Sequence, residues 1–197
     1  MRHVPLKPAG AAPPASMRRS PLTLTLLALD RDARGDLLAA IPGLVPDEGL
    51  ALTLAELIDQ GPAARPAVGE VDGWTILVDT LFAVPDQAEV VHRATRGRNG
   101  YAFLWQAASA SHGFGAHSDG TGHRSAFRSQ GRWMIDQGEP LPEERGLDWD
   151  ADPEAALAEL ASRLTGLDVA HAGLWQAALT PLRPAPRRSK TGRALGR

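Results

Sequence analysis

The segment YAFLWQAASASHGFGAHSDGTGHRSAFRSQGRWMID, residues 101–136, decides the fold class. Aromatic side chains occupy alternate positions at its start, with smaller apolar side chains between and after them: Tyr101, Phe103 and Trp105 against Ala102, Leu104 and Ala108. Successive side chains of a strand point to opposite faces, so both faces of this strand are apolar. The pattern predicts a central strand of a sheet.

Two turn motifs follow, Ser118-Asp119-Gly120-Thr121 and Ser129-Gln130-Gly131-Arg132. In both, glycine is the second residue of a two-residue loop, a position that favours a positive φ in β-hairpins. The turns separate strands predicted near 111–117, 122–128 and 132–136. Together with the first strand they predict an antiparallel meander.

Signals for helices surround this meander. Thr53 with Glu56, and Asp86 with Glu89, have the spacing of a capping box, in which each side chain accepts a hydrogen bond from the other residue's backbone N–H. Each helix is predicted to end at a glycine, Gly61 and Gly97 respectively.

The C-terminal part begins with an extended acidic connector, Gly138–Glu144. Asp152 as a cap, Pro153 at the first helical position and Glu154 near the positive end of the dipole predict a helix that ends at Gly166. The apolar segment His171–Leu182 predicts a last helix.

The N-terminal half contributes two further strands. Leu22–Leu29 predicts the first strand, with a helix continuing toward Leu38 as the alternative, and Trp74–Val84 predicts a buried strand. With 197 residues, 43% of them hydrophobic, the chain can bury one sizeable core. We therefore expect one α+β domain over residues 21–182, an antiparallel meander sheet with helices packed on one face.

Charge divides the chain into three parts. Residues 1–20 and 183–197 carry ten of the 21 Lys and Arg residues and no acid, and we expect both to be disordered basic tails. Residues 21–182 hold 11 arginines against all 23 acidic residues, a net charge of about −12. The tails contain no aromatic side chain for stacking on bases, and the acidic body repels phosphate, so a protein partner is favoured over nucleic acid.

The sequence also bears on location. Met17–Leu29 resembles a signal peptide, but Asp30 and Asp32 follow where a small-residue cleavage site belongs, so we interpret the run as a strand and keep Met17 as an alternative start. No run approaches the roughly 20 apolar residues that span a bilayer. The absence of cysteine suits a cytoplasmic protein and excludes disulfides and thiolate chemistry.

Two arrangements suggest metal sites, and both fail on geometry. His112 and His123 share a face if the hairpin turns at Asp119-Gly120, but they lie about 13 Å apart along the strands, and His117 points to the opposite face. The acids Asp148, Asp150, Asp152 and Glu159 have the spacing of an EF-hand loop, but Pro153 stands where the loop needs glycine. We expect neither a metal nor a cofactor.

The chain has no motif for nucleophilic catalysis or phosphate binding of the forms G-x-S-x-G, G-x-x-x-x-G-K, or G-x-G-x-x-G before a helix. No catalytic residue is therefore predicted. An enzyme of unrecognised type stays open as an alternative.

Two surfaces are candidate partner-binding sites. Carrying the strand pairing through the second hairpin gives one face with His117, Arg124, Arg128 and Trp133, and an opposite, core-facing side with Phe114, Phe127 and Met134. Arginine beside tryptophan is frequent at interfaces, although the same face is also compatible with the solvated side of a sheet. The second surface is the linker 139–154, with seven acids against one arginine; its candidate residues are Glu143, Glu144, Asp148 and Asp150.

The segments Gly73-Trp74-Thr-Ile-Leu-Val-Asp79, Ser118-Asp119-Gly120 and Gly138–Glu144 resemble small bacterial α+β proteins of uncharacterised function, some of them similar to immunity proteins of toxin systems. The resemblance covers about half of the chain, Gly73–Gly166, and implies no catalytic residues. It implies an intracellular interaction protein whose acidic body binds and neutralises a basic toxin. The alternative is a small-ligand or regulatory binding module that uses the face with Arg124, Arg128 and Trp133.

Overall fold

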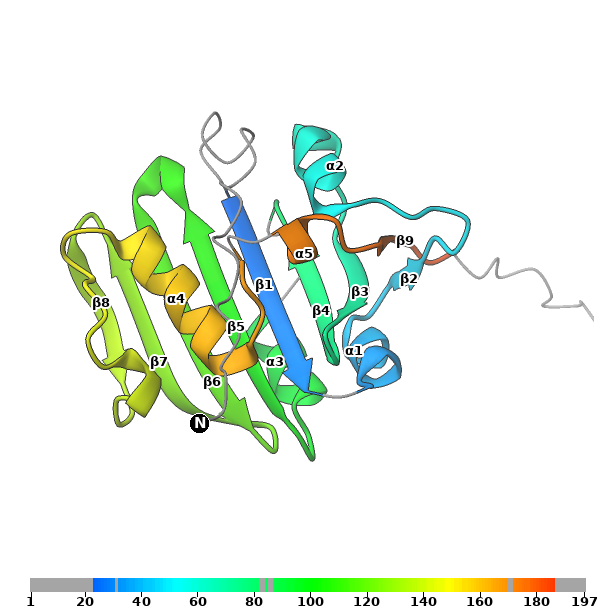
Figure 1. Cartoon of the computed structure of the whole chain (residues 1–197). Helices are drawn as coiled ribbons and strands as arrows, with labels where there is room; N and C mark the ends of the chain where they lie inside the picture. The colour runs from blue at the N-terminus through cyan, green and yellow to red at the C-terminus, as the bar shows by residue number, and fades with distance from the viewer. Residues whose placement is uncertain (1–22, 31, 82–83, 85–86, 170–171, 187–197) are drawn as a thin grey trace, which may run out of the picture.

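A computed structural model describes residues 23–186 apart from 31, 82–83, 85–86 and 170–171. Nine antiparallel strands form one sheet in the order β2-β9-β3-β4-β1-β5-β6-β7-β8 (Figure 1). The strands are β1 (Thr23–Asp30), β2 (Leu44–Pro46), β3 (Ala67–Val71), β4 (Trp74–Asp79), β5 (Asn99–Gln106), β6 (Ser111–Ser118), β7 (Thr121–Ser129), β8 (Arg132–Gln137) and β9 (Leu179–Pro184). The helices are α1 (Arg34–Ala40), α2 (Leu54–Asp59), α3 (Gln87–Ala94), α4 (Pro153–Thr165) and α5 (Ala172–Trp175).

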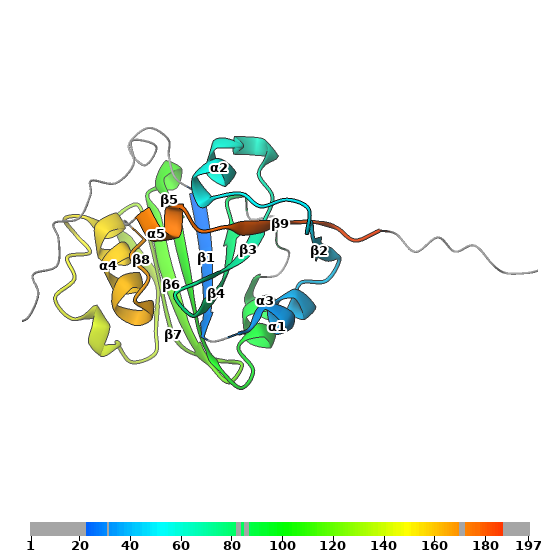
Figure 2. The ribbon, with the colours of Figure 1, turned by 45° about the vertical axis from the view of Figure 1, so that its right-hand side comes forward.

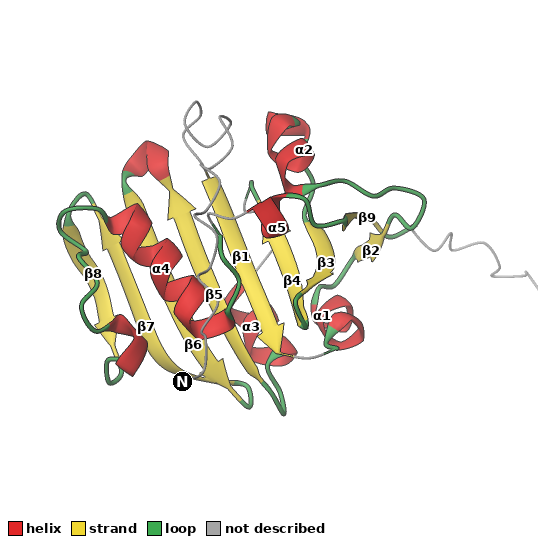
Figure 3. Cartoon of the chain, in the orientation of Figure 1, coloured by secondary structure: helices red, strands yellow, loops and turns green. Residues whose placement is uncertain are grey.

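Helices cover both faces of the sheet (Figure 2). On one side, which we call the α4 face, Leu157 and Leu160 of α4 pack in a buried cluster with Phe103 and Trp105 of β5. On the other side, which we call the α3 face, side chains of α1 and α3 form a second cluster with alternate residues of β1 and β4; it includes Leu37, Val90, Leu27 and Leu77. Figure 3 shows the strands as one continuous layer with α4 crossing in front of β5 and β6.

This arrangement confirms the predicted α+β class and the antiparallel sheet in one domain. The helices lie on two faces, however, and not on one. The reason is visible in β1, where Leu26 and Leu27 are both buried although they point to opposite sides. Each side needs its own cover to remove these apolar side chains from water.

The local signals of the sequence correspond to the observed elements. Asp119 and Gly120 both have positive φ, 49° and 73°, as a type I′ hairpin turn requires, and the predicted meander β5-β6-β7-β8 is confirmed. The capping box of Thr53 with Glu56 begins α2. Asp152 caps α4 through a 2.9 Å hydrogen bond from the N–H of Ala155. The other predicted cap, Asp86, lies outside the described residues.

Three elements differ from the sequence prediction. Strand β4 ends at Asp79, not at Val84. Ala108 belongs to a 3₁₀ turn after β5. The segment His171–Leu182 is not one helix, because its described part contains the short α5 and then β9. Pro181 explains the last difference, since proline interrupts a helix.

Strand β9 closes the sheet between β2 and β3. Leu179 and Leu52 exchange two backbone hydrogen bonds of 2.7 and 2.9 Å, which hold the start of β9. The strand runs to Pro184, two residues beyond the predicted domain boundary. Residues 1–22 and 187–197, which include most of the predicted tails, lie outside the described residues. None of the helices in the described part is long and apolar enough to cross a membrane.

Candidate functional site

Two β-bulges change which side chains share a face in the meander. Between β6 and β7, His117 pairs with Gly122 but Ala116 pairs with Arg124, so His123 is an extra residue. Between β7 and β8, Phe127 pairs with Ile135 but Arg128 pairs with Trp133, so Met134 is extra. Each bulge moves the residues beyond it to the other face relative to the partner strand.

The face assignments of the sequence analysis are therefore partly wrong. Arg124, Arg128 and Trp133 share the α4 face, and the predicted pairing of Arg128 with Trp133 is confirmed. His117 points to the α3 face and does not join them. Phe114 and Phe127, expected together on the core side, lie on opposite faces.

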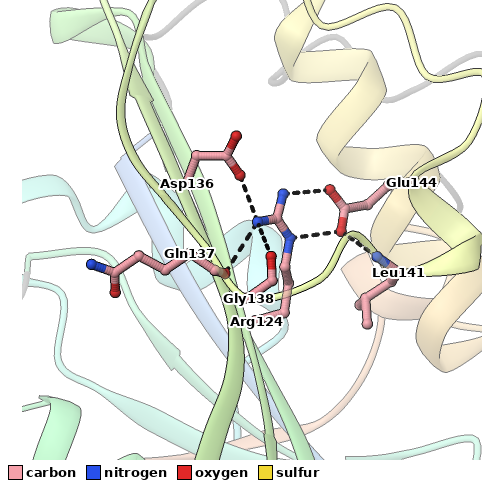
Figure 4. Close-up of polar contacts among 6 residues, drawn as sticks. All are labelled: Arg124, Asp136, Gln137, Gly138, Leu141 and Glu144. Carbon is pink, nitrogen blue, oxygen red and sulfur yellow. Dashed lines mark hydrogen bonds and ion pairs between the residues drawn. The ribbon is translucent and has the colours of Figure 1, made fainter.

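Arg124 is buried, with 5% of its surface exposed, and its guanidinium is saturated with acceptors (Figure 4). Nε and Nη2 each donate a 2.8 Å hydrogen bond to the carboxylate of Glu144. Nη1 donates to Oδ1 of Asp136 at 2.6 Å and to the carbonyl of Gln137 at 3.1 Å. The hydrogen bond with Glu144 raises the pKa of Arg124, so this arginine stays cationic.

Arg128, 7% exposed, makes the equivalent contact further along the linker. Its Nη2 donates to Oδ1 of Asp150 at 2.6 Å, and Nη1 donates to the carbonyl of Trp149. The guanidinium lies 5.7 Å from the centre of the Trp133 ring. The Trp149 ring stacks on Phe114 at 6.2 Å and meets Trp133 edge-on at 5.5 Å.

The two predicted surfaces thus contact each other. The acidic linker lies over the arginine face, and each guanidinium has a carboxylate partner from the same chain. We call Arg124, Arg128, Glu144 and Asp150 the arginine cluster. It neutralises charges that the sequence analysis assigned to an external partner, and it fixes the path of the chain from β8 to α4.

The other predicted linker residues have local roles. Glu143 is half-buried, and its backbone carbonyl accepts a 2.9 Å hydrogen bond from Arg163 of α4. The exposed Asp148 accepts hydrogen bonds from the N–H groups of Asp150 and Ala151 at 3.2 and 2.9 Å. These contacts order the turn before α4.

Two histidines of β6 lie in contrasting places. His112 is buried on the α4 face beside Arg128, its Nδ1 has no hydrogen-bond partner among the described residues, and burial lowers its pKa. His117 is half-buried on the α3 face; burial and the nearby His123 and His92 lower its pKa. Within the described ranges no three His, Asp or Glu side chains are placed to hold a metal ion.

Strand β8 is the most exposed apolar part of the described sheet. All six of its residues are exposed, and three consecutive large side chains, Trp133, Met134 and Ile135, are 43%, 65% and 41% exposed. Among the described strands, β8 pairs with β7 alone, so its other edge is open. The opposite edge of the sheet, β2, has three half-buried residues and ends in Pro46. Short length and proline protect an edge, and β8 has neither.

The exposure of β8 was missed by the sequence analysis, which placed Met134 on the core side. The sequence did indicate an edge strand here, because β8 is the last strand of the predicted meander and no further strand was predicted after it. The exposed edge and the arginine cluster are the two distinctive features of this end of the sheet. Comparison of the chain with family models, with curated proteins and with solved structures finds no match.

Proposed function

We propose that the protein is a protein-binding domain whose partner docks along β8. The observation that carries the proposal is the open edge of β8 with its three exposed apolar side chains. An unpaired strand edge offers backbone N–H and C=O groups to a second chain, and apolar side chains beside it gain free energy when a partner covers them.

The arginine cluster supports this assignment by holding β8 in place. Arg124 bonds to Asp136 and to the backbone of Gln137, and Arg128 contacts the ring of Trp133. A rigid edge loses little conformational entropy when a partner binds, which favours affinity. The exposed strand is therefore suited to a preformed docking site.

The finer proposal concerns the partner. The net charge of about −12 over residues 21–182 favours a basic protein, because complementary charge speeds encounter and rejects acidic competitors. The resemblance to toxin-system immunity proteins makes a basic toxin domain, neutralised in a bacterial cytoplasm, the first partner to test. The alternative ligand site at Arg124 and Arg128 is less favoured, since both already bind carboxylates of their own linker.

The test begins with affinity capture from the native cell, followed by titration of each purified candidate against the full chain. Met134→Glu places a charge at the centre of the proposed interface, and we expect it to weaken binding at least tenfold. The matched control is Leu50→Glu, because Leu50 is also an exposed large apolar residue but precedes α2, away from β8.

Equal loss of affinity in both variants, or in neither, would contradict docking along β8. The finer proposal has its own test, in which the chain is co-expressed with toxin domains encoded beside its gene. Survival of the cells with the original chain but not with Met134→Glu would support it. Absence of protection against every such toxin would reject the immunity role and leave the binding site to be judged by the titration.

A further inference from the structure

The α3 face of the sheet is only partly covered. The described residues buried against α1 and α3 come from β1, β3, β4 and β9, and none comes from β6, β7 or β8. A hollow of about 370 Å³ lies over this uncovered region. Its apolar wall includes Val91 of α3, Leu104 of β5, Phe127 of β7 and Ile135 of β8.

Two glycines of β6, Gly113 and Gly115, form the base of this hollow. A Cβ atom on Gly113 would lie 2.9 Å from Cδ2 of Phe127, its cross-strand partner, and one on Gly115 would lie 3.0 Å from Nε2 of His117. The rings of Phe127 and His117 therefore lean over the glycines, as aromatic side chains do in sheets. The result is a flat floor with an imidazole at one end.

Three polar side chains line the hollow: Thr25, His117 and Ser125. The hydroxyl oxygen of Thr25 is buried and has no hydrogen-bond partner among the described residues. The structure also shows no hydrogen bond from His117 to another described residue. An apolar hollow with a few unpaired polar groups is typical of sites for small molecules.

Basic side chains adjoin His117. His123 of β7 and His92 of α3 act on it electrostatically, and the side chain of Arg96 lies beside Gly120 in the adjoining turn. Nearby acids already have partners: Glu89 pairs with Arg93, and Asp119 accepts a 2.9 Å hydrogen bond from the N–H of Gly97. At the other end of the hollow, Asp79 lies opposite Thr25 in the β1–β4 register and accepts hydrogen bonds from the N–H groups of Leu81 and Val84. Its negative charge disfavours a ligand carboxylate at that end.

We propose that this hollow binds a linear aliphatic carboxylate, with the carboxylate at His117 and the chain over Phe127 toward Ile135. From His117 to Gly113 the strand advances four residues, about 13 Å, which matches an extended chain of about ten carbons. The protonated imidazole of His117 complements the carboxylate, and the apolar wall removes the chain from water. The site lies on the opposite face from the arginine cluster. It shares Ile135 with the proposed docking surface on β8, whereas Met134 belongs to the docking surface alone.

Binding of the carboxylate favours the protonated imidazole, so it raises the pKa of His117 from its lowered value. A carboxylate stays ionised above about pH 5, and affinity is therefore expected to increase from pH 8 to pH 6 as His117 gains its proton. Each added methylene within the hollow contributes about 0.8 kcal/mol, which corresponds to about fourfold in the dissociation constant.

The experiment titrates the full chain with decanoate, butanoate and decanol by calorimetry. We expect one decanoate per chain, and much weaker binding of butanoate and decanol. Ile135→Ser should weaken decanoate binding about tenfold through lost apolar contact. Met134→Ser, on the same strand but outside the hollow, should leave the binding of decanoate unchanged.

A second variant tests the head group separately. His117→Gln should weaken decanoate several-fold and leave decanol unchanged, and in the unaltered chain the NMR titration of His117 should move to higher pH when decanoate is added. No binding of decanoate at millimolar concentration would overturn the proposal. So would equal effects of Ile135→Ser and Met134→Ser, or decanol that binds as tightly as decanoate.

Discussion

Arg124 accounts for much of the order at the β8 end of the sheet, because one guanidinium joins β7, β8 and the linker. Its partner Glu144 is itself only 11% exposed, so both charges have left bulk water. A buried pair of this kind need not stabilise the fold more than apolar side chains would. Removing one member, however, leaves the other charge buried and unpaired.

Replacing Arg124 by Met should therefore lower the free energy of unfolding by about 3 to 5 kcal/mol. The matched control is Arg93→Met, which removes an exposed i,i+4 pair with Glu89 and should cost about 0.5 kcal/mol or less. Urea denaturation followed by tryptophan fluorescence measures both values. Equal costs for the two variants would mean that the linker is held by its apolar contacts alone.

The buried His112 makes the stability of the fold depend on pH. Burial lowers its pKa in the folded chain, whereas in the unfolded chain the ring titrates near 6.5. The unfolded state therefore binds the proton more tightly, and stability is complete above about pH 6.5 and decreases as the pH falls through that value. The neighbouring acids Asp152 and Glu154 oppose this effect without reversing it.

The free energy of unfolding of the unaltered chain should thus decrease from pH 7 to pH 5, and His112→Gln should make the decrease smaller. Denaturation curves at four pH values give the two slopes. His123→Gln is the comparison, because His123 is exposed on the bulge of β7; it acts on the slope only through His117 and should change it less than His112→Gln does. A slope unaffected by His112→Gln would contradict this origin of the acid sensitivity.

Short-range signals predicted the elements that depend on neighbouring residues. The capping box at Thr53 and the cap at Asp152 are hydrogen bonds between residues three positions apart, so the local sequence predicts them. The turn at Asp119-Gly120 was predicted because glycine and aspartate tolerate the positive φ that a tight hairpin turn needs. The similar turn at Asp72-Gly73, with φ of 48° and 83°, was readable in the same way but was missed, and with it strand β3.

The path of the linker after β8 requires glycine at position 138, because the backbone there has a positive φ and passes close to β7. Gly138 and Gly146 both have positive φ, 83° and 74°, so alanine is strained at either position by about 1 to 2 kcal/mol. A Cβ on Gly138 would also overlap the carbonyl of His123 and lie 3.1 Å from Cα of Arg124, whereas nothing lies within 4 Å of one on Gly146.

Gly138→Ala should therefore cost about 1 to 3 kcal/mol more than Gly146→Ala, because the linker must move away from β7. Chemical denaturation of the two variants checks the difference. If both cost the same, the close approach of the linker to β7 does not constrain the chain.

At the scale of the whole molecule, the features that the sequence did not predict are those set by distant segments. The bulge at His123 puts His117 on the face opposite Arg124 and Arg128, and nothing in the local sequence marks it. The bulge at Met134, which places Ile135 opposite Phe127, is equally unmarked. The linker covers Arg124 and Arg128 only because α4 returns over β5 and β6. The sequence thus singled out Arg124, Arg128, Glu144 and Asp150 but not the contacts between them, and the exposed edge of β8 was missed.

Strand β9 depends on distant segments for its position, because both of its neighbours in the sheet come from the N-terminal half of the chain. It joins β2 to β3 across the sheet, and Leu179 and Leu182 are buried, so its loss exposes both leucines and removes the partner of β2. Two buried leucines contribute about 3 to 6 kcal/mol, a large part of the 5 to 15 kcal/mol that stabilises a typical domain. A chain ending at Ala178 should therefore melt at least about 10 °C lower than the full chain, or lose its cooperative transition.

A chain ending at Pro186 keeps every described residue and should melt within about 2 °C of the full chain. Calorimetry of the three chains decides the matter, and a chain ending at Ala178 that melts like the full chain would mean that β9 is dispensable to the fold.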